Sequence, residues 1–147
     1  MSLVIVGTVA FDAIETPFGK TDKIVGGAAT FAGLSASYLY NNVKLVSVIG
    51  EDFGQNIDIV TSKGINVEGV EVVSGGKSFF WSGKYHNDMN SRDTLITELN
   101  VLADFDPKIP ASYQDCEYLL LGNLTPQVQL DTLERLENKP KLVVLDT

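Results

Sequence analysis

The sequence is poor in positive charge and in cysteine, and it has no long apolar run. Its 147 residues include 11 lysines and arginines against 19 aspartates and glutamates, a formal net charge of −8. Nucleic acids and anionic membranes bind basic faces, so both are excluded as partners. The single cysteine, Cys116, cannot form an internal disulfide, and no basic region followed by an apolar run opens the chain. His86 is the one histidine, and without a second histidine nearby we expect no metal site there. We therefore expect a cytoplasmic protein that binds small molecules.

Short apolar runs alternate with segments of helical spacing. Each run has the pattern of a strand buried on both faces. The strands are predicted at residues 3–6, 43–49, 118–121 and 141–145, and the helices at residues 28–41, 55–63 and 127–137. Asp52 is suited to cap the helix over 55–63, and Gly64 to end it. This order predicts an α/β fold with a doubly wound, mainly parallel sheet.

A second group of strands is predicted around residues 10–24 and 67–100. Residues 67–73 and 78–85 are rich in β-forming residues and are joined by Ser-Gly-Gly-Lys, which is a hairpin signal. Residues 93–99 alternate polar and apolar side chains with a period of two. We expect these strands to form a flap or a second small sheet.

The stretch around Gly26-Gly27 carries the strongest signal for a binding site. The two glycines open directly into a helix of small residues. Glycines let a ligand approach the backbone, and the unpaired N–H groups of a first helical turn can bind oxygens. Asp12 lies just past the first buried strand, where open α/β sheets bind ligands. Asp12, Gly26 and Gly27 are therefore candidate binding residues; the alternatives are a tight turn and a solvated loop acid.

Two aromatic residues and an asparagine are further candidates. Strand alternation points Phe80 away from Phe79 and Trp81, so at least one aromatic ring is expected to face the cleft. There it could stack on a base or a sugar, which favours a nucleoside, although a role in the core of the flap is the alternative. Asn123 follows a buried strand, and it either approaches the substrate or begins the turn to Pro126.

Several motifs occur in a fixed order along the chain. Residues 26–32 read Gly-Gly-Ala-Ala-Thr-Phe-Ala, and residues 48–54 read Val-Ile-Gly-Glu-Asp-Phe-Gly. Together they resemble the N-terminal signature of the ribokinase/PfkB family of sugar and nucleoside kinases. Further segments fit the same family: residues 4–7 with Asp12, residues 64–70, residues 119–123 with Pro126, and residues 142–146. The resemblance covers essentially the whole chain.

The resemblance implies a ribokinase-like fold. Residues 1–147 would form the N-terminal part of a single α/β domain, including lid strands around 10–24 and 67–100. The C-terminal ATP-binding half would lie outside this sequence. The apolar run at 142–145 needs neighbours on both faces, which also indicates the front half of a larger doubly wound fold.

The implied activity is phosphoryl transfer from ATP, with Mg2+, to the hydroxymethyl group of a sugar or ribonucleoside. Asp12 would accept hydrogen bonds from sugar hydroxyls, and Gly26 and Gly27 would press their backbone against the sugar. Thr30 stands where the family usually has an asparagine that touches the substrate. Asp146 stands where the segment that organises magnesium and phosphates would begin. The catalytic Gly-Ala-Gly-Asp motif has no counterpart, so the base is expected beyond residue 147 and the chain alone is expected to be inactive.

A second hypothesis is a non-catalytic small-molecule-binding or dimerisation fragment of the same fold. In this case the pocket at Asp12 would bind a polyol, and the flap strands would pair in a homodimer; such pairing is also plausible for the kinase. A dinucleotide oxidoreductase is not favoured, because residues 7–12 lack the Gly-x-Gly-x-x-Gly fingerprint.

Overall fold

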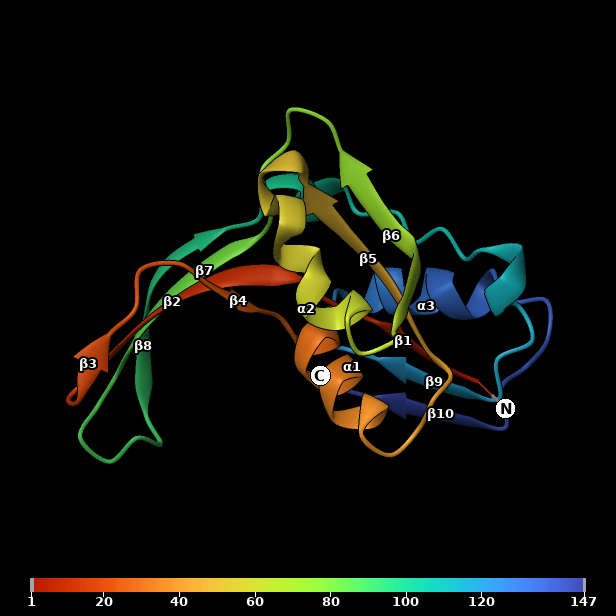
Figure 1. Cartoon of the computed structure of the whole chain (residues 1–147), viewed down its shortest axis with the longest axis horizontal. Helices are drawn as coiled ribbons and strands as arrows, with labels where there is room; N and C mark the ends of the chain where they lie inside the picture. The colour runs from red at the N-terminus through yellow and green to blue at the C-terminus, as the bar shows by residue number, and fades with distance from the viewer. Residues whose placement is uncertain (1, 147) are drawn as a thin grey trace.

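The computed structural model describes residues 2–146, which form two five-stranded sheets (Figure 1). The main sheet has the order β10-β9-β1-β5-β6, and all neighbouring strands in it are parallel. Its strands are β1 (Leu3–Val6), β5 (Val43–Gly50), β6 (Asn66–Val73), β9 (Tyr118–Leu121) and β10 (Leu142–Leu145). The predicted α/β class and mainly parallel sheet are confirmed.

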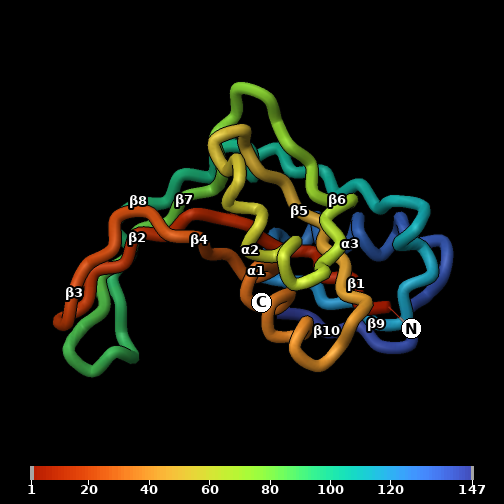
Figure 2. Tube along the Cα trace, in the orientation of Figure 1, coloured from red at the N-terminus to blue at the C-terminus, as the bar shows by residue number. Residues whose placement is uncertain are grey.

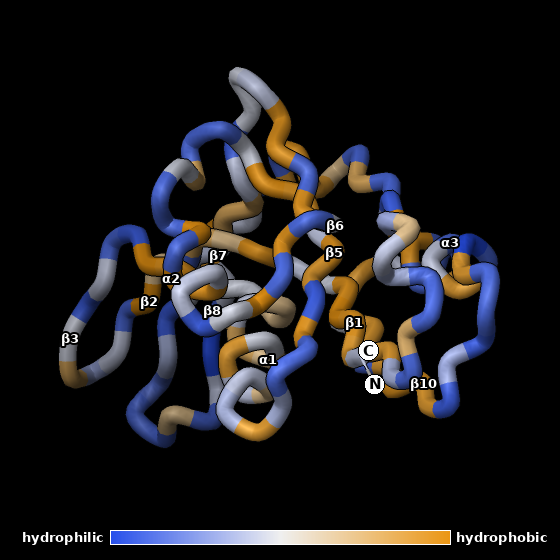
Figure 3. The backbone as a smooth tube through the Cα atoms, turned by 45° about the vertical axis from the view of Figure 1, so that its right-hand side comes forward, coloured by the Kyte–Doolittle hydropathy of each residue, from blue (hydrophilic) through white to orange (hydrophobic). Residues whose placement is uncertain are grey.

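The second sheet projects from one end of the main sheet, and Figure 2 shows the chain crossing between the two. Its path is β3-β2-β7-β8, and β4 also pairs with β2. The strands are β2 (Ala10–Thr16), β3 (Gly19–Lys20), β4 (Ile24–Gly26), β7 (Phe80–Tyr85) and β8 (Arg92–Glu98). The tip of this sheet is mostly hydrophilic, whereas hydrophobic segments run through β1 and β5 (Figure 3).

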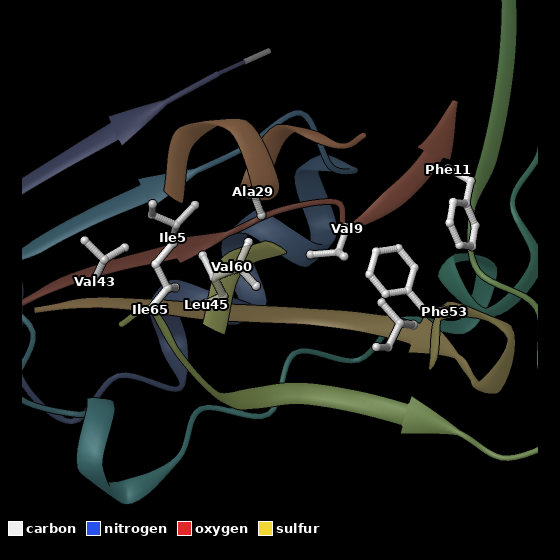
Figure 4. Close-up of a cluster of buried hydrophobic side chains, with 10 residues drawn as sticks. Ile5, Val9, Phe11, Ala29, Val43, Leu45, Phe53, Val60 and Ile65 are labelled. Atoms are coloured by element: carbon white, nitrogen blue, oxygen red, sulfur yellow. The ribbon is translucent and has the colours of Figure 1, made fainter. Parts of the chain in front are cut away.

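Helices cover both faces of the main sheet. The longer ones are α1 (Ala28–Ser37) and α3 (Pro126–Glu134); the short ones are α2 (Asp58–Thr61) and the 3-10 helices η1 (Glu51–Ile57), η2 (Asn100–Asp104) and η3 (Ala111–Tyr113). Figure 4 shows one core cluster, in which Ile5 of β1 and Leu45 of β5 pack with Ala29 of α1 and Val60 of α2. Alternate residues such as Val4 and Val46 face the other way, toward Tyr113 of η3. This double cover explains why the strands read as continuous apolar runs.

The predicted hairpin over residues 67–85 is wrong. β6 pairs in parallel with β5, with Gly69 opposite Val46, so it is an edge strand of the main sheet. β7 instead pairs in parallel with β2 and antiparallel with β8. The Ser-Gly-Gly-Lys segment is therefore a crossover between sheets, with Gly75 at φ 68°. The second sheet consists of residues 10–26 and 80–98, and the predicted range of 67–100 is too long.

The segment after β5 also differs from the prediction. It begins as the 3-10 helix η1 and continues into the short α2, and the side chain of Asp52 does not cap either helix. Gly64 follows at φ 74°, the left-handed conformation that was predicted for it. None of the helices in residues 2–146 has the length and apolar character needed to cross a membrane.

β10 forms where it is predicted, but it is not buried. Its four residues are between 39% (Val143) and 55% (Leu145) exposed. β10 pairs with β9 on one edge, and no other strand in residues 2–146 pairs with its second edge. Leu130 and Leu133 of α3 are also exposed, at 48% and 39%. The main sheet thus has an open apolar edge on this side.

Candidate functional site

Asp12 lies in β2, directly against the glycine pair. β2 and β4 are antiparallel, and they place Ala10 opposite Gly26 and Asp12 opposite Ile24. A Cβ atom added to Gly26 would lie 2.0 Å from Oδ2 of Asp12, so only glycine leaves room for this carboxylate. The structure therefore brings together Asp12 and Gly26, which the sequence separates by a loop and a short strand.

The Asp12 carboxylate is partly buried and has no hydrogen-bond or ion-pair partner among residues 2–146. Burial raises the pKa of Asp12 above its usual value, because the charged form loses solvation. Both carboxylate oxygens remain able to accept hydrogen bonds from a ligand.

Gly27 adopts a φ of 100° at the start of α1, a conformation that glycine tolerates. It packs against Thr8, since an added Cβ atom would lie 2.3 Å from the Thr8 carbonyl oxygen. Thr8 Oγ1 accepts a hydrogen bond from the Ala28 N–H, and the Thr8 carbonyl accepts one from the Ala29 N–H, both at 2.9 Å. The expectation that the first helical turn presents free N–H groups to a ligand is wrong for these two groups.

A cavity of about 280 Å³ opens beside Thr8. Thr8 follows β1 and Asn123 follows β9, so the cavity lies at the carboxyl ends of the parallel strands, where the fold class predicts a site. Phe79, just before β7, and Thr97 of β8 also line it. The remaining lining is mostly apolar and consists of Leu99, Leu102, Ala103, Phe105, Leu124, Thr125 and Val128.

Strand register decides which aromatic residue shares a face with Asp12. Asp12 is opposite Trp81, and Trp81 is opposite Thr97, so these three side chains project from one face of the second sheet. Phe80 is opposite Phe11 and projects from the other face, where it lines a separate cavity of about 340 Å³. Phe80 and Trp81, both candidates from the sequence, therefore cannot contact the same ligand from this sheet.

The Trp81 ring does not line the cavity beside Thr8. It covers Gly83, where an added Cβ atom would lie 2.1 Å from the indole, and its Nε1 donates to Thr94 Oγ1 at 3.3 Å. Phe79 is the aromatic residue that lines the cavity. Sequence reasoning missed Phe79 and Thr8 as site residues, although Thr8 carries a hydroxyl just past the end of a buried strand.

Thr30 and Asp146 lie away from the cavity lining. Thr30 is 1% exposed and its hydroxyl has no partner, so its side chain is inaccessible to a ligand in this structure. Asp146 follows β10, and Gln129 Nε2 donates to the carbonyls of both Gly122 (2.7 Å) and Asp146 (3.0 Å). This bridge holds the carboxyl ends of β9 and β10 together.

Asp146 does not belong to a cluster of metal ligands. Within residues 2–146, no group of three or more histidine, cysteine, aspartate or glutamate side chains is placed to hold a metal ion. The described residues therefore do not by themselves form a magnesium site.

Comparison with known proteins gives one clear relative and many similar structures. No protein-family model matches the chain. A cytidine kinase of Thermococcus kodakarensis is 31% identical over 140 residues, which are 95% of this chain and 49% of the relative. The chain thus spans about half the length of the curated relative that it matches.

The structural matches agree with one another. A ribokinase of Cryptococcus neoformans, solved with ADP, has a TM-score of 0.70 and 20% identity over 99% of this chain and 49% of its own. A nucleoside kinase of Methanocaldococcus jannaschii has a TM-score of 0.72 and 18% identity over 99% and 52%. A nucleoside kinase of Burkholderia thailandensis, solved with inosine, has a TM-score of 0.75 and 17% identity over 92% and 48%.

These likenesses define the fold as ribokinase-like, as the sequence motifs indicate. The cytidine kinase is similar to the chain in amino-acid sequence, at 31% identity, and so supports more than a shared fold. The chain is thus similar in sequence to a cytidine kinase and in fold to ribokinases and nucleoside kinases, so the predicted resemblance to the ribokinase family of sugar and nucleoside kinases is confirmed.

Proposed function

We propose that this chain supplies the substrate site of a kinase that phosphorylates the hydroxymethyl group of a nucleoside. The observation that carries the proposal is the unpartnered carboxylate of Asp12, held against Gly26. Asp12 does not itself line the cavity beside Thr8, but it projects from the same sheet face as Thr97, which does. The cytidine kinase relative and the nucleoside kinase solved with inosine support a nucleoside.

Asp12 and the glycine pair would recognise the ribose. An ionised carboxylate accepts hydrogen bonds from two neighbouring hydroxyls, and it does so without a competing partner from residues 2–146. Gly26 has no side chain, so the sugar ring can approach both the backbone and the carboxylate. These contacts would orient the hydroxymethyl group for transfer.

The cavity beside Thr8 would hold the base. Its volume of about 280 Å³ is near the lower end for small-molecule sites, about 300–1,000 Å³. The apolar lining suits the faces of an aromatic ring, and the Asn123 amide offers a donor and an acceptor for its polar edge. A free sugar bound at Asp12 would leave this volume unused, which favours a nucleoside over a sugar.

The phosphate donor would bind outside the described residues. We propose ATP and Mg2+ as donor and cofactor, with a further parallel strand pairing with the open edge of β10 and covering its exposed side chains. Asp146, at the carboxyl end of β10, would then face the donor. By the resemblance, the catalytic base would also lie outside these residues. Dimerisation through the second sheet and a cytoplasmic location belong to the same proposal.

Binding of a set of matched ligands tests the proposed site. We expect calorimetry to show binding of cytidine or another ribonucleoside, and about 10- to 100-fold weaker binding of the analogue that lacks one ribose hydroxyl. The reason is that each hydrogen bond to a charged acceptor contributes about 1.5–3 kcal/mol. Ribose alone should bind more weakly than the nucleoside, because it leaves the apolar cavity empty. Ribose binding as tightly as every nucleoside would contradict the assignment of the cavity to a base.

A further inference from the structure

A second group of interactions lies where β5 of the main sheet meets the start of β7. Asp52 Oδ1 accepts hydrogen bonds from the backbone N–H and the hydroxyl of Ser78, at 2.8 and 2.7 Å. The same hydroxyl accepts a hydrogen bond from the Gly50 N–H at 3.0 Å. Asn100, which follows β8, donates from Nδ2 to the Ser78 carbonyl at 2.9 Å. One serine just before β7 thus joins the end of β5 to Asn100, which lies just after β8.

Lys23 brings a further segment of the chain to the same point. It lies just before β4, and its Nζ is 3.4 Å from Asp52 Oδ2. The same ammonium group lies 4.0 Å from the centroid of the Phe11 ring in β2. Phe11 in turn packs on Phe53, with ring centroids 4.8 Å apart. Asp52 therefore contacts segments that enter the second sheet from two distant parts of the sequence.

The group is partly shielded from solvent. Ser78 is 1% exposed, and the Asp52 side chain is 28% exposed. Burial alone would raise the pKa of Asp52, but the hydrogen bonds from Ser78 and the Lys23 ammonium outweigh it and hold the pKa below its usual value. The carboxylate is therefore ionised at neutral pH, and its bonds to Ser78 are of the stronger, charge-assisted kind.

Two walls of the cavity beside Thr8 are direct chain neighbours of this group. Phe79 follows Ser78, and Leu99 precedes Asn100; both Phe79 and Leu99 line the cavity. Neither Asp52 nor Ser78 belongs to the two hydrophobic core clusters. The group is thus joined through the chain to the cavity wall, and a change in it removes no side chain of these two clusters.

We propose that Asp52 and Ser78 form a latch that fixes the second sheet, which carries Asp12, against the carboxyl end of the main sheet, which makes Asp52 a positioning residue for ligand binding. Only the effect of the latch on ligand binding rests on the proposed function. Without the latch, the sheet samples tilted arrangements, and ligand affinity falls in proportion to the fraction of molecules in the competent arrangement.

The test compares Asp52→Ala and Asp52→Asn with the control Asp58→Asn, which changes an exposed aspartate of α2. Hydrogen exchange of β7 and β8 amides and the fluorescence of Trp81, the only tryptophan, report on the second sheet without any ligand. In Asp52→Ala we expect β7 and β8 to exchange about 10-fold faster while β1 and β5 stay protected. Nucleoside should bind about 10-fold more weakly. Asp52→Asn keeps an acceptor for Ser78 and should lie between alanine and wild type.

Each outcome decides a separate claim. Unchanged exchange of β7 and β8 in Asp52→Ala would overturn the latch. Faster exchange with unchanged affinity would overturn the positioning role. If the amides of β1 and β5 also exchange faster in Asp52→Ala, Asp52 supports the whole fold and the latch is overturned. The latch then stands only if Asp52→Asn speeds the exchange of β7 and β8 alone. If the wild type binds no nucleoside, the proposed function fails, and the exchange data still decide the latch.

Discussion

Replacing Asp12 with asparagine is expected to weaken nucleoside binding by about 10- to 100-fold and to leave the fold at least as stable as the wild type. The amide oxygen of asparagine can still accept from one hydroxyl, so about one charge-assisted hydrogen bond is lost, and such a bond contributes about 1.5–3 kcal/mol. Stability should not fall, because the carboxylate has no partner within residues 2–146 that the change would leave unsatisfied. Calorimetric titration and thermal unfolding measure the two effects separately.

The direction of the stability change follows from the pKa of Asp12. Burial raises the folded-state pKa above the unfolded value, so the ionised group opposes folding at neutral pH, and this penalty disappears below the unfolded pKa. Asparagine carries no charge at any pH. The variant should therefore unfold at an equal or higher temperature at pH 7, and this difference should shrink in acid. Affinity of the wild type should fall as the pH drops through the raised pKa.

Asp22→Asn is the matched control, since Asp22 is an exposed aspartate just before β4. It should change neither affinity nor stability. Unchanged nucleoside affinity in Asp12→Asn would remove Asp12 from the site, and a large drop in its unfolding temperature would show that the carboxylate has a structural partner.

The second large effect is expected from Gly27→Ala, which should destabilise the protein by about 2–5 kcal/mol. A φ of 100° is strained for alanine, and the new methyl group would lie 2.3 Å from the Thr8 carbonyl oxygen, a backbone atom that cannot rotate away. Backbone strain of this kind costs about 1–3 kcal/mol, and overpacking costs a similar amount. Urea unfolding followed by circular dichroism measures the change.

Gly64→Ala separates the two causes. Gly64 also has a positive φ, 74°, but an added Cβ atom there would meet no heavy atom within 4 Å. It should cost only the strain of the left-handed conformation, about 1–2 kcal/mol. An equal loss of stability in the two variants would mean that the Thr8 carbonyl oxygen lies farther from Gly27 than it does in the structure.

The main sheet could be predicted from sequence because each strand carries its own signal. Residues 3–6, 43–49 and 118–121 are covered on both faces, so they read as unbroken apolar runs. β6 was misassigned because Ser-Gly-Gly-Lys is a local hairpin signal, whereas the true partner of β6 is β5. Which strand pairs with which depends on contacts between residues that are distant in sequence, and local turn chemistry does not encode these contacts.

The candidate site could be predicted only in part. Asp12 and Gly26 carry local signals, and strand pairing brings them together. The contribution of Phe79 depends on how the second sheet folds over the strand ends, which its immediate sequence does not report. Thr8 has a hydroxyl just past a buried strand, but this position alone does not show that a cavity forms beside it. Asp52 has the local pattern of a helix cap, but its partner is Ser78, which lies across the junction of the two sheets.

The most direct test of the central claim is phosphoryl transfer by the whole protein that contains this chain. The protein would be incubated with ATP, Mg2+ and either cytidine, other ribonucleosides or ribose, with ADP release and the phosphorylated product both measured, and with Asp12→Asn as a matched variant. We predict formation of a nucleoside 5′-monophosphate, with kcat/KM reduced about 10- to 100-fold in the variant. Turnover of ribose alone, or nucleoside turnover that is unaffected by Asp12→Asn, would contradict the account.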